Sequence, residues 1–351
     1  MIEELFKENL KVFKAYEVPK LEYKVKLDAN ESFLALDEEI LETIASRLKK
    51  ITINRYPDAE SQTVCQLYGQ YSGISPKNII AGNGSDELIQ MIVGTFVDKN
   101  EKIMTLNPDF SMYKSYVELA GGKALHFELD EEFNLDVESL VEKVNEEKVK
   151  ILFISNPNNP IGRVIERREI IKIIKSCNCI VVIDEAYFEF YGESVVDEVQ
   201  DYENLIVLRT CSKAIAVAGI RLGFLITNDL LLNEIKKVKP PFNVNSVTQL
   251  IGEVVLENTA NIKEAIEKIV KERSFLLEQL ASIEKIKIYP TFANFILIQS
   301  ENIDRIYNGL FEKGIIVRKF KDERLKRCLR ITVGSRKENQ ILLDCLKGIE
   351  L

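Results

Sequence analysis

Short apolar runs alternate with amphipathic, helix-like segments over residues 77–235. The runs at 79–81, 180–183 and 205–208 are apolar at every position, without the polar alternation of a half-exposed strand. Strands of this kind are buried on both faces, as in a parallel sheet that carries helices on either side. The pattern therefore predicts a mostly parallel α/β domain. Further strands are expected at 103–106, 149–154 and 222–227, and helices at 85–97, 111–119 and 169–176.

The pattern changes after Pro240 and Pro241. A long charged stretch with helical periodicity covers residues 247–283. Strands are then expected at 285–289, 294–299, 315–318 and 329–333, with helices at 303–313 and 338–347. This mixture predicts a smaller α+β domain, and 351 residues exceed what one core usually spans. We expect an N-terminal arm and small-domain segment at 1–30, a large domain at 31–240 and a small domain at 241–351.

Polar residues cluster where the strands of the large domain end. Asp184 comes directly after one buried strand, Lys213 lies just past another, and Asn159 follows a third. In open α/β sheets, ligands bind in the crevice at the carboxyl ends of the strands. The layout therefore predicts one small-molecule site at this edge of the sheet.

Two of these residues suggest specific chemistry. A carboxylate such as Asp184, emerging from a buried strand, is costly unless it is paired. It can cap the next turn, pair with an arginine, or keep a pyridine nitrogen protonated. Lys213 is either solvated or, if its pKa is lowered by burial and by a cation such as Arg221, able to form a Schiff base.

A group of residues at the same edge predicts an anion site. A helix opens directly after the strand at 79–81, so its free N–H groups and its dipole favour a phosphate. Two hydroxyls and a guanidinium elsewhere at this edge add donors of the kind that phosphates accept from. The set comprises Gly84, Ser85, Asp86, Thr210, Ser212 and Arg221.

Composition narrows the range of partners. The formal net charge is −8 and the sequence isoelectric point is about 5.2, which disfavours nucleic-acid binding. The start of the chain carries acidic residues and lacks the long apolar region of a signal peptide. No apolar run is long enough to span a bilayer. We expect a cytoplasmic protein that binds neither nucleic acid nor membrane.

Histidine and cysteine usage excludes other chemistry. The only histidine, His126, lies in an alternating strand-like segment, so a Ser-His-Asp or Cys-His nucleophile is disfavoured. The six cysteines are scattered and are expected to be reduced thiols, mostly buried. With a single histidine and no Cys-x-x-Cys pair, the sequence gives no support to a metal site.

Several motifs occur together at the ends of the predicted strands. They include Asn-Pro-x-Gly at 159–162, Asp-Glu-Ala-Tyr at 184–187, and Ser-Lys-Ala at 212–214 followed by Gly-x-Arg at 219–221. In this order they resemble the fold-type I pyridoxal-phosphate (PLP) enzymes of the aminotransferase superfamily, and the resemblance covers nearly the whole chain. Further matching segments lie at 27–31, 55–57, 84–87 and 329–334.

The resemblance implies roles for individual residues around PLP. Lys213 would hold the cofactor as a Schiff base and shuttle a proton, and Asp184 would pair with the ring nitrogen. Tyr187 and Asn159 would hydrogen-bond the phenolic oxygen, and Phe110 would stack on the ring. The cofactor phosphate would be held by Gly84, Ser85, Asp86, Thr210, Ser212 and Arg221, and by Tyr56 of a partner subunit in a homodimer with shared active sites.

Substrate binding is implied for four more residues. Arg330 would bind the carboxylate of glutamate, and Arg330 with Arg318 the phosphate of an amino-phosphate substrate. Tyr16 and Asn30 would line the pocket. For Tyr16 and Arg318, an ordinary surface position is the alternative.

The sequence departs from the family pattern at three positions. Phe110 stands where a tyrosine is usual, Ile161 where the turn usually has threonine, and Ile215 where phenylalanine is common after the lysine. None removes a group that the chemistry needs, although the Phe110 change bears on cofactor tuning and substrate preference.

The implied activity is transamination between L-histidinol phosphate and 2-oxoglutarate in histidine biosynthesis. Two activities of the same fold remain open, namely threonine-phosphate decarboxylation and aromatic amino acid transamination. A non-catalytic regulator of this fold usually carries an added DNA-binding domain, for which the chain has no spare segment, and the complete set of site residues also argues against it.

Overall fold

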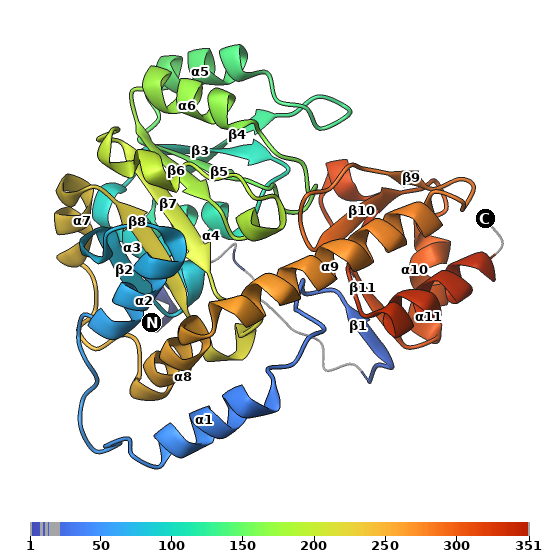
Figure 1. Ribbon diagram of the computed structural model, residues 1–351. Helices are drawn as coiled ribbons and strands as arrows, with labels where there is room; N and C mark the ends of the chain where they lie inside the picture. The colour runs from blue at the N-terminus through green and yellow to red at the C-terminus, as the bar shows by residue number, and fades with distance from the viewer. Residues whose placement is uncertain (1, 8–9, 11–12, 14–21, 350–351) are drawn as a thin grey trace.

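The chain forms two sheets joined by a long helix, as Figure 1 shows. The computed structural model describes residues 2–7, 10, 13 and 22–349. The larger sheet has seven strands in the order β2-β8-β7-β6-β5-β3-β4. Only β8 runs antiparallel to its neighbours, so the predicted mostly parallel sheet is confirmed. The strands are β2 (Ile79–Gly82), β3 (Lys102–Asn107), β4 (Lys123–Glu128), β5 (Ile151–Ser155), β6 (Ile180–Asp184), β7 (Leu205–Thr210) and β8 (Gly223–Thr227).

Helices cover both faces of this sheet. In β5, Leu152 and Ile154 pack into one hydrophobic core, whereas Ile151 and Phe153 pack into the other. Because both faces are buried, the four positions from Ile151 to Ile154 are all apolar, which is why the runs lack alternation. One face carries α3 (Gly84–Phe96), α4 (Met112–Ala120) and α7 (Asp229–Lys236); the other carries α2 (Gln62–Ser72), α5 (Val137–Glu146), α6 (Arg167–Ser176) and α8 (Ser246–Glu257).

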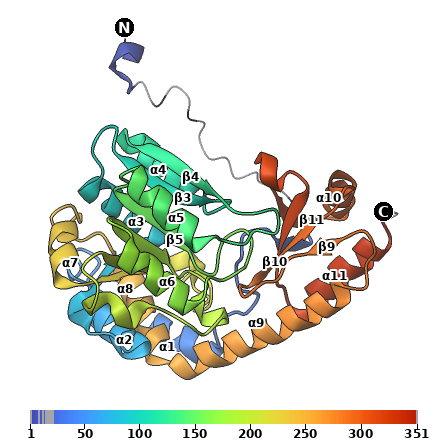
Figure 2. The ribbon, with the colours of Figure 1, turned by 90° about the horizontal axis from the view of Figure 1, so that it is seen from above.

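The prediction of one helical stretch at 247–283 is wrong, because two separate helices cover this range. The helix is interrupted at Asn258, whose backbone dihedral angles leave the helical region (φ −112°, ψ 50°). Its side-chain amide donates to the Val254 carbonyl at 2.7 Å, a local bond of the kind that competes with helix continuation. The first helix, α8, packs against α1 (Glu38–Leu48) and α2. The second, α9 (Thr259–Leu280), runs from there to the small sheet (Figures 1 and 2).

The small sheet has five strands in the order β1-β11-β12-β10-β9. Its edge strand β1 (Val25–Leu27) pairs in parallel with β11 (Ile315–Lys319), so residues 25–27 belong to the same sheet as the C-terminal strands. The smaller α+β unit is therefore confirmed, while the limits at 30 and 240 remain a prediction. Its other elements are β9 (Lys287–Ile288), β10 (Phe295–Gln299), β12 (Cys328–Thr332), α10 (Ile303–Glu312) and α11 (Arg336–Lys347).

Six short 3₁₀ helices complete the described elements. They are η1 (Ile2–Leu5), η3 (Pro76–Asn78), η4 (Phe188–Phe190), η5 (Val196–Gln200), η6 (Ala218–Ile220) and η7 (Glu323–Leu325). In the described part of the chain, no helix combines the length and apolar character needed to cross a bilayer.

Candidate active site

The carboxyl ends of three neighbouring strands form the floor of the site. Asp184 ends β6 and lies opposite Ser155, the last residue of β5, while Thr210 ends β7. All three side chains are buried. The expected convergence of polar residues at this edge is therefore present, and it follows from the parallel pairing of β5, β6 and β7.

Asp184 is a buried carboxylate held by two donors. The Tyr113 hydroxyl donates to Oδ2 at 2.7 Å, and the Ala186 N–H donates to Oδ1 at 3.1 Å. Burial raises the pKa of Asp184 to about 6, and these two bonds oppose the rise. A carboxylate can accept about four hydrogen bonds, so Asp184 can still accept one from a protonated ring nitrogen.

Lys213 lies deep in the same site. Its Nζ donates to the Ala29 carbonyl at 2.9 Å. Burial, the Arg330 guanidinium and, to a smaller extent, Arg221 lower the pKa of Lys213 to about 8. An amine with this pKa is partly neutral near pH 8 and can act as a nucleophile or a base.

The expected anion site has little room for side chains. Gly84, the first residue of α3, has φ +76°, and a Cβ there would lie 2.7 Å from Arg221 Nη2. Arg221 Nη2 also pairs with Asp86 Oδ2 at 3.0 Å, and Nη1 lies 3.5 Å from the Ser212 hydroxyl. A helix N-terminus, a guanidinium and the linked hydroxyls of Thr210 and Ser212 (3.0 Å) suit a phosphate group.

The segment at 28–31 and the small sheet cover the site from the other side. Asn30 Nδ2 donates to the Tyr187 hydroxyl at 2.9 Å. Arg330 Nη1 donates to Asn159 Oδ1 at 2.5 Å, and its Nη2 donates to the Asp28 carbonyl at 2.8 Å. Thus Asn30, Asn159, Tyr187 and Arg330, which the sequence scatters over 300 residues, meet around Lys213.

The structure describes all but one of the remaining predicted residues. Tyr56 is 81% exposed and stacks on Phe242 with the ring centroids 4.5 Å apart. Arg318 is exposed but is the cross-strand partner of Arg330 in the small sheet. Phe110 is partly buried and packs edge-on against Tyr113 (5.4 Å, 81°). Tyr16 and Ser85 complete the list: Tyr16 lies outside the described residues, and Ser85 is the second residue of α3.

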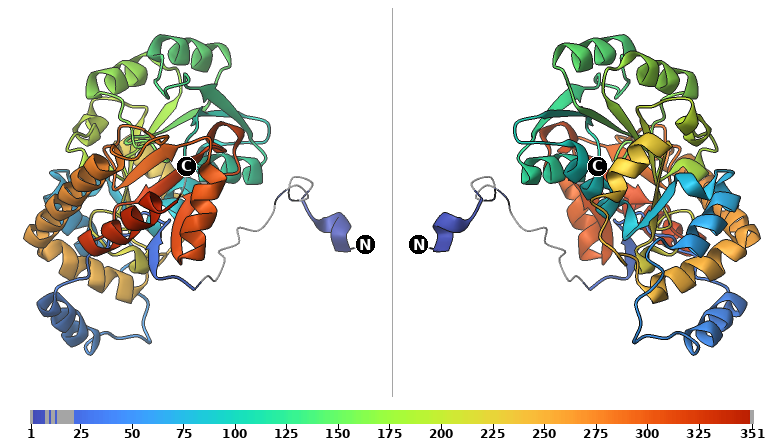
Figure 3. Two further views of the ribbon diagram at one scale, coloured as in Figure 1. Left: turned by 90° about the vertical axis from the view of Figure 1, so that its right-hand side faces the viewer. Right: turned by 90° about the vertical axis from the view of Figure 1, so that its left-hand side faces the viewer.

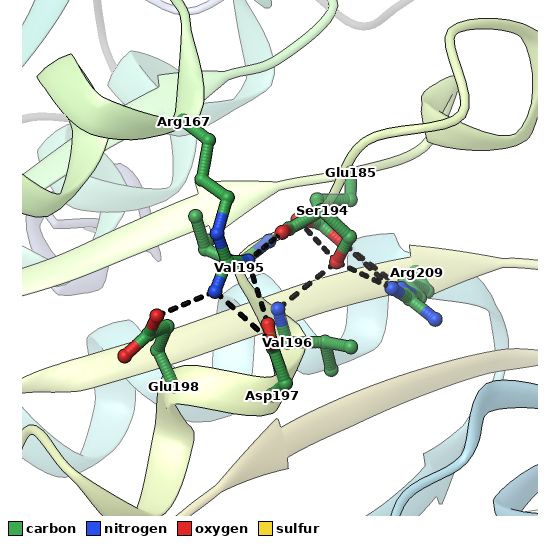
Figure 4. A network of polar contacts seen from close by, with 8 residues as sticks. All are labelled: Arg167, Glu185, Ser194, Val195, Val196, Asp197, Glu198 and Arg209. Atoms are coloured by element: carbon green, nitrogen blue, oxygen red, sulfur yellow. Dashed lines mark hydrogen bonds and ion pairs between the residues drawn. The ribbon is translucent and has the colours of Figure 1, made fainter.

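Sequence reasoning missed several buried polar residues beside the site. Tyr113 bonds to Asp184, and Asp109 accepts hydrogen bonds from the Ser155 hydroxyl and the Phe110 N–H. Burial raises the pKa of Asp109 to about 8. Glu185 and Arg209 form a buried ion pair at 2.9 Å (Figure 4). For the Glu185–Arg209 pair, the sequence did offer a signal, because Arg209 directly follows the apolar run at 205–208.

Comparisons with known proteins agree with this geometry. The family model for aminotransferase class I and II matches residues 22–346. Histidinol-phosphate aminotransferase from Clostridium kluyveri is 60% identical over 349 residues, covering 99% of both chains. The protein of the same name from Clostridium novyi is 55% identical over 348 residues, covering 99% of this chain and 98% of that one.

A solved structure shares the fold. The structure of histidinol-phosphate aminotransferase from Sinorhizobium meliloti in complex with pyridoxal-5'-phosphate superposes with a TM-score of 0.90 at 22% identity, covering 98% of each chain. At that identity the likeness concerns the fold alone. It agrees with the fold class expected from the motifs.

Proposed function

The chain belongs to the class I and II aminotransferases, and on that premise we propose that it transfers the amino group of L-histidinol phosphate to 2-oxoglutarate. The products would be imidazole acetol phosphate and L-glutamate, and the reaction would be a step of histidine biosynthesis. The observation that carries this proposal is the 60% identity over 99% of the chain to a protein of that name. The cofactor of this reaction is PLP, which fits the site.

The described residues suit the binding of PLP. The cofactor, when bound, supplies an electron sink for the bond that breaks at the amino-bearing carbon of the substrate. Lys213 would hold the cofactor and then move the proton at that carbon. Asp184 would keep the ring nitrogen protonated, while Asn159 and Tyr187 would bind the phenolic oxygen. Phe110 would pack on the ring, and Gly84, Ser85, Asp86, Thr210, Ser212 and Arg221 would bind the phosphate.

Two arginines support a site that accepts both substrates. Arg318 and Arg330 are cross-strand partners, so their side chains leave the same face of the small sheet. The forked donors of a guanidinium match the geometry of both a carboxylate and a phosphate. Arg330 would therefore bind the carboxylate of glutamate, and both arginines the phosphate of histidinol phosphate. Asn30, with Tyr16, would line the pocket.

We also propose a cytoplasmic homodimer with shared active sites. Ile53 and Tyr56 are 82% and 81% exposed, and the apolar residues Phe242 and Val247 are also exposed. Exposed apolar groups of this kind are typical of interaction surfaces. Figure 3 shows that η1, whose Leu5 is also exposed, stands away from both sheets. Tyr56 would bind the cofactor phosphate of the partner subunit, and six unpaired thiols fit a reducing compartment.

The absorbance spectrum of the purified protein tests the reaction directly. Adding L-histidinol phosphate without a keto acid should replace the yellow band of bound PLP with the near-ultraviolet band of its amine form. If the protein stays yellow, the substrate or the reaction is different, and threonine phosphate and aromatic amino acids should be tested next. A colourless protein that PLP does not restore would contradict the cofactor assignment.

Lys213→Ala is the matched control for this experiment. Without the amine, no covalent link to PLP can form and no group remains to move the proton. We expect turnover to fall below detection in a coupled glutamate assay, and the yellow band to change in the spectrum. Transamination that persists in Lys213→Ala would contradict the role of this lysine.

A further inference from the structure

Tyr113 is a fully buried tyrosine whose hydroxyl reaches the carboxylate at the centre of the site. Its ring stacks on Phe153 of β5, with the centroids 4.8 Å apart and the planes at 13°. The hydroxyl donates to Asp184 Oδ2 at 2.7 Å, and the side chain has no exposed surface. Phe110 packs edge-on against the same ring. A side chain fixed by packing on two sides presents its hydroxyl in one place only.

The two oxygens of Asp184 are held in different ways. Oδ1 accepts from the backbone N–H of Ala186, a donor that belongs to the same turn. Oδ2 accepts from Tyr113, which comes from α4 on one face of the sheet. The bond to Tyr113 is therefore the contact that ties the carboxylate to a separate element and sets its rotation about the Cβ–Cγ bond. Orientation matters because a hydrogen bond weakens steeply as its angle closes.

The surroundings of Asp184 oppose its negative charge. Burial is the largest cause, and the carboxylates of Asp86 and Glu185 add repulsion. Asp109 and Tyr187, on neighbouring segments, are further acidic groups that interact with Asp184. Within the described residues, the donors that favour the ionised carboxylate are Tyr113 and Ala186, since a hydrogen bond to a charged form stabilises that form.

We propose that Tyr113 is a positioning residue for the reaction, whose hydroxyl holds the Asp184 carboxylate in the orientation and the charge state that pair with the ring nitrogen of PLP. The proposal rests on the function proposed above. Tyr113 touches neither substrate nor reacting atoms in this arrangement; it acts through Asp184 and, through ring packing, on the position of Phe110.

The test removes the hydroxyl and keeps the ring. In Tyr113→Phe, the stacking on Phe153 is retained, and only the bond to Asp184 is lost. We expect the dissociation constant for PLP to rise roughly ten- to a hundredfold, the range that one hydrogen bond to a charged group contributes. We also expect kcat to fall more than KM changes, and the pH dependence of the absorbance of bound PLP to shift. The first and last readouts do not depend on turnover.

Tyr289→Phe is the matched control. Tyr289, directly after β9 of the small sheet, is also buried, and its hydroxyl donates a hydrogen bond to Gln299 Oε1 at 2.6 Å. Its substitution should leave PLP binding and the spectrum unchanged. If Tyr113→Phe does not fold while Tyr289→Phe does, the hydroxyl of Tyr113 serves the fold and the inference is wrong.

A double-mutant cycle separates positioning from simple structural loss. If Tyr113 acts through Asp184, then Tyr113→Phe should change PLP affinity far less in an Asp184→Asn background than in the wild type. Equal losses of PLP affinity in both backgrounds, or wild-type affinity in Tyr113→Phe, would overturn this inference but leave the proposed function intact. Wild-type protein that does not bind PLP would instead overturn the proposed function, and the inference with it.

Discussion

At the scale of single residues, the surroundings of Lys213 favour reactivity and lower the stability of the folded protein. Its amine is buried, makes one described hydrogen bond to a carbonyl, and lies in the field of two guanidiniums, Arg330 and Arg221. Glu31 and Asp86 offset this field only in part. A buried cation in such a place destabilises the protein, and the same conditions make its amine reactive.

We expect Lys213→Met to stabilise the cofactor-free protein at pH 7. Burial lowers the pKa of Lys213 to about 8 from 10.5, so the folded state binds fewer protons than the unfolded state between these values. Stability therefore rises with pH across this window. Below pH 8 the wild type carries the full destabilisation, on the order of 3 kcal/mol for a shift of this size, and the Met variant has no such charge. The gain should fade between pH 8 and 10.5.

Urea unfolding of both cofactor-free proteins, followed by circular dichroism at several pH values, measures this difference. A gain that stays constant to pH 10.5, or a loss of stability at pH 7, would show that the buried charge is not the cause.

At the scale of elements, a second hydrogen-bond network links the segment after β6 to β7. Arg209 Nε donates to Glu185 Oε2 at 2.9 Å, and Nη2 donates to the Ser194 hydroxyl at 2.7 Å (Figure 4). The Val195 N–H donates to Glu185 Oε1 at 2.8 Å. Tyr187 lies in the segment between Glu185 and Ser194. The network therefore joins the two ends of the loop that contains this residue of the candidate site.

Arg209→Met should destabilise the protein strongly. Arg209 and Glu185 are each 2% exposed, and removing one partner leaves the other charge buried and unpaired. Such a loss typically costs about 3–5 kcal/mol. Arg168→Met is the matched control: Arg168 is 78% exposed beside Glu166, and a surface pair contributes about 0–1 kcal/mol. Denaturant unfolding should show a much larger loss in the free energy of unfolding for Arg209→Met than for Arg168→Met. Similar losses would mean that the buried ion pair does not stabilise the protein more than a surface pair.

The sequence predicted the strands of the large sheet closely because burial on both faces leaves an apolar run with polar residues at its end. Asp184 and Lys213 could be placed together for the same reason. The break at Asn258 could not be predicted, because the periodicity continues on both sides of it. The helices α1, α2, α5 and α7 were not predicted, although α5 has as many apolar positions as α6, which was predicted. The Arg330–Asn159 and Asn30–Tyr187 bonds depend on how the two units pack, which no local pattern encodes.

At the scale of the whole molecule, the site is built from both units of the chain. Arg330 of β12 bonds to Asn159 after β5, and the Phe292 N–H donates to the Gly162 carbonyl at 2.8 Å. A Cβ on Gly162, which has φ +89°, would lie 2.2 Å from Thr291 Oγ1, so the turn at 159–162 fits the small unit only with glycine there. If Arg330 binds the substrate and Asn159 the cofactor, as proposed, this hydrogen bond fixes the two groups relative to each other.

The exposed Tyr56 leads to a prediction for the dimer. In a mixed dimer of Lys213→Ala and Tyr56→Ala subunits, one site has the intact Lys213 of its own chain and, if Tyr56 crosses the interface, the intact Tyr56 of its partner. The other site carries both defects. The isolated mixed dimer should then have about half of the wild-type activity, from one intact site of two, although each parent variant is impaired. Co-expression with two different affinity tags and sequential purification isolates the mixed species.

The same experiment has a defined opposite outcome. If Tyr56 serves its own chain, the mixed dimer holds one site without Lys213 and one without Tyr56, and its activity cannot exceed the average of the two parents. A protein that sediments as a monomer would exclude the shared site altogether. Because Tyr56 stacks on Phe242 of its own chain, Phe242→Ala should weaken PLP binding in the partner site only if the crossing occurs, since the stacked pair would then hold Tyr56 toward the neighbouring subunit.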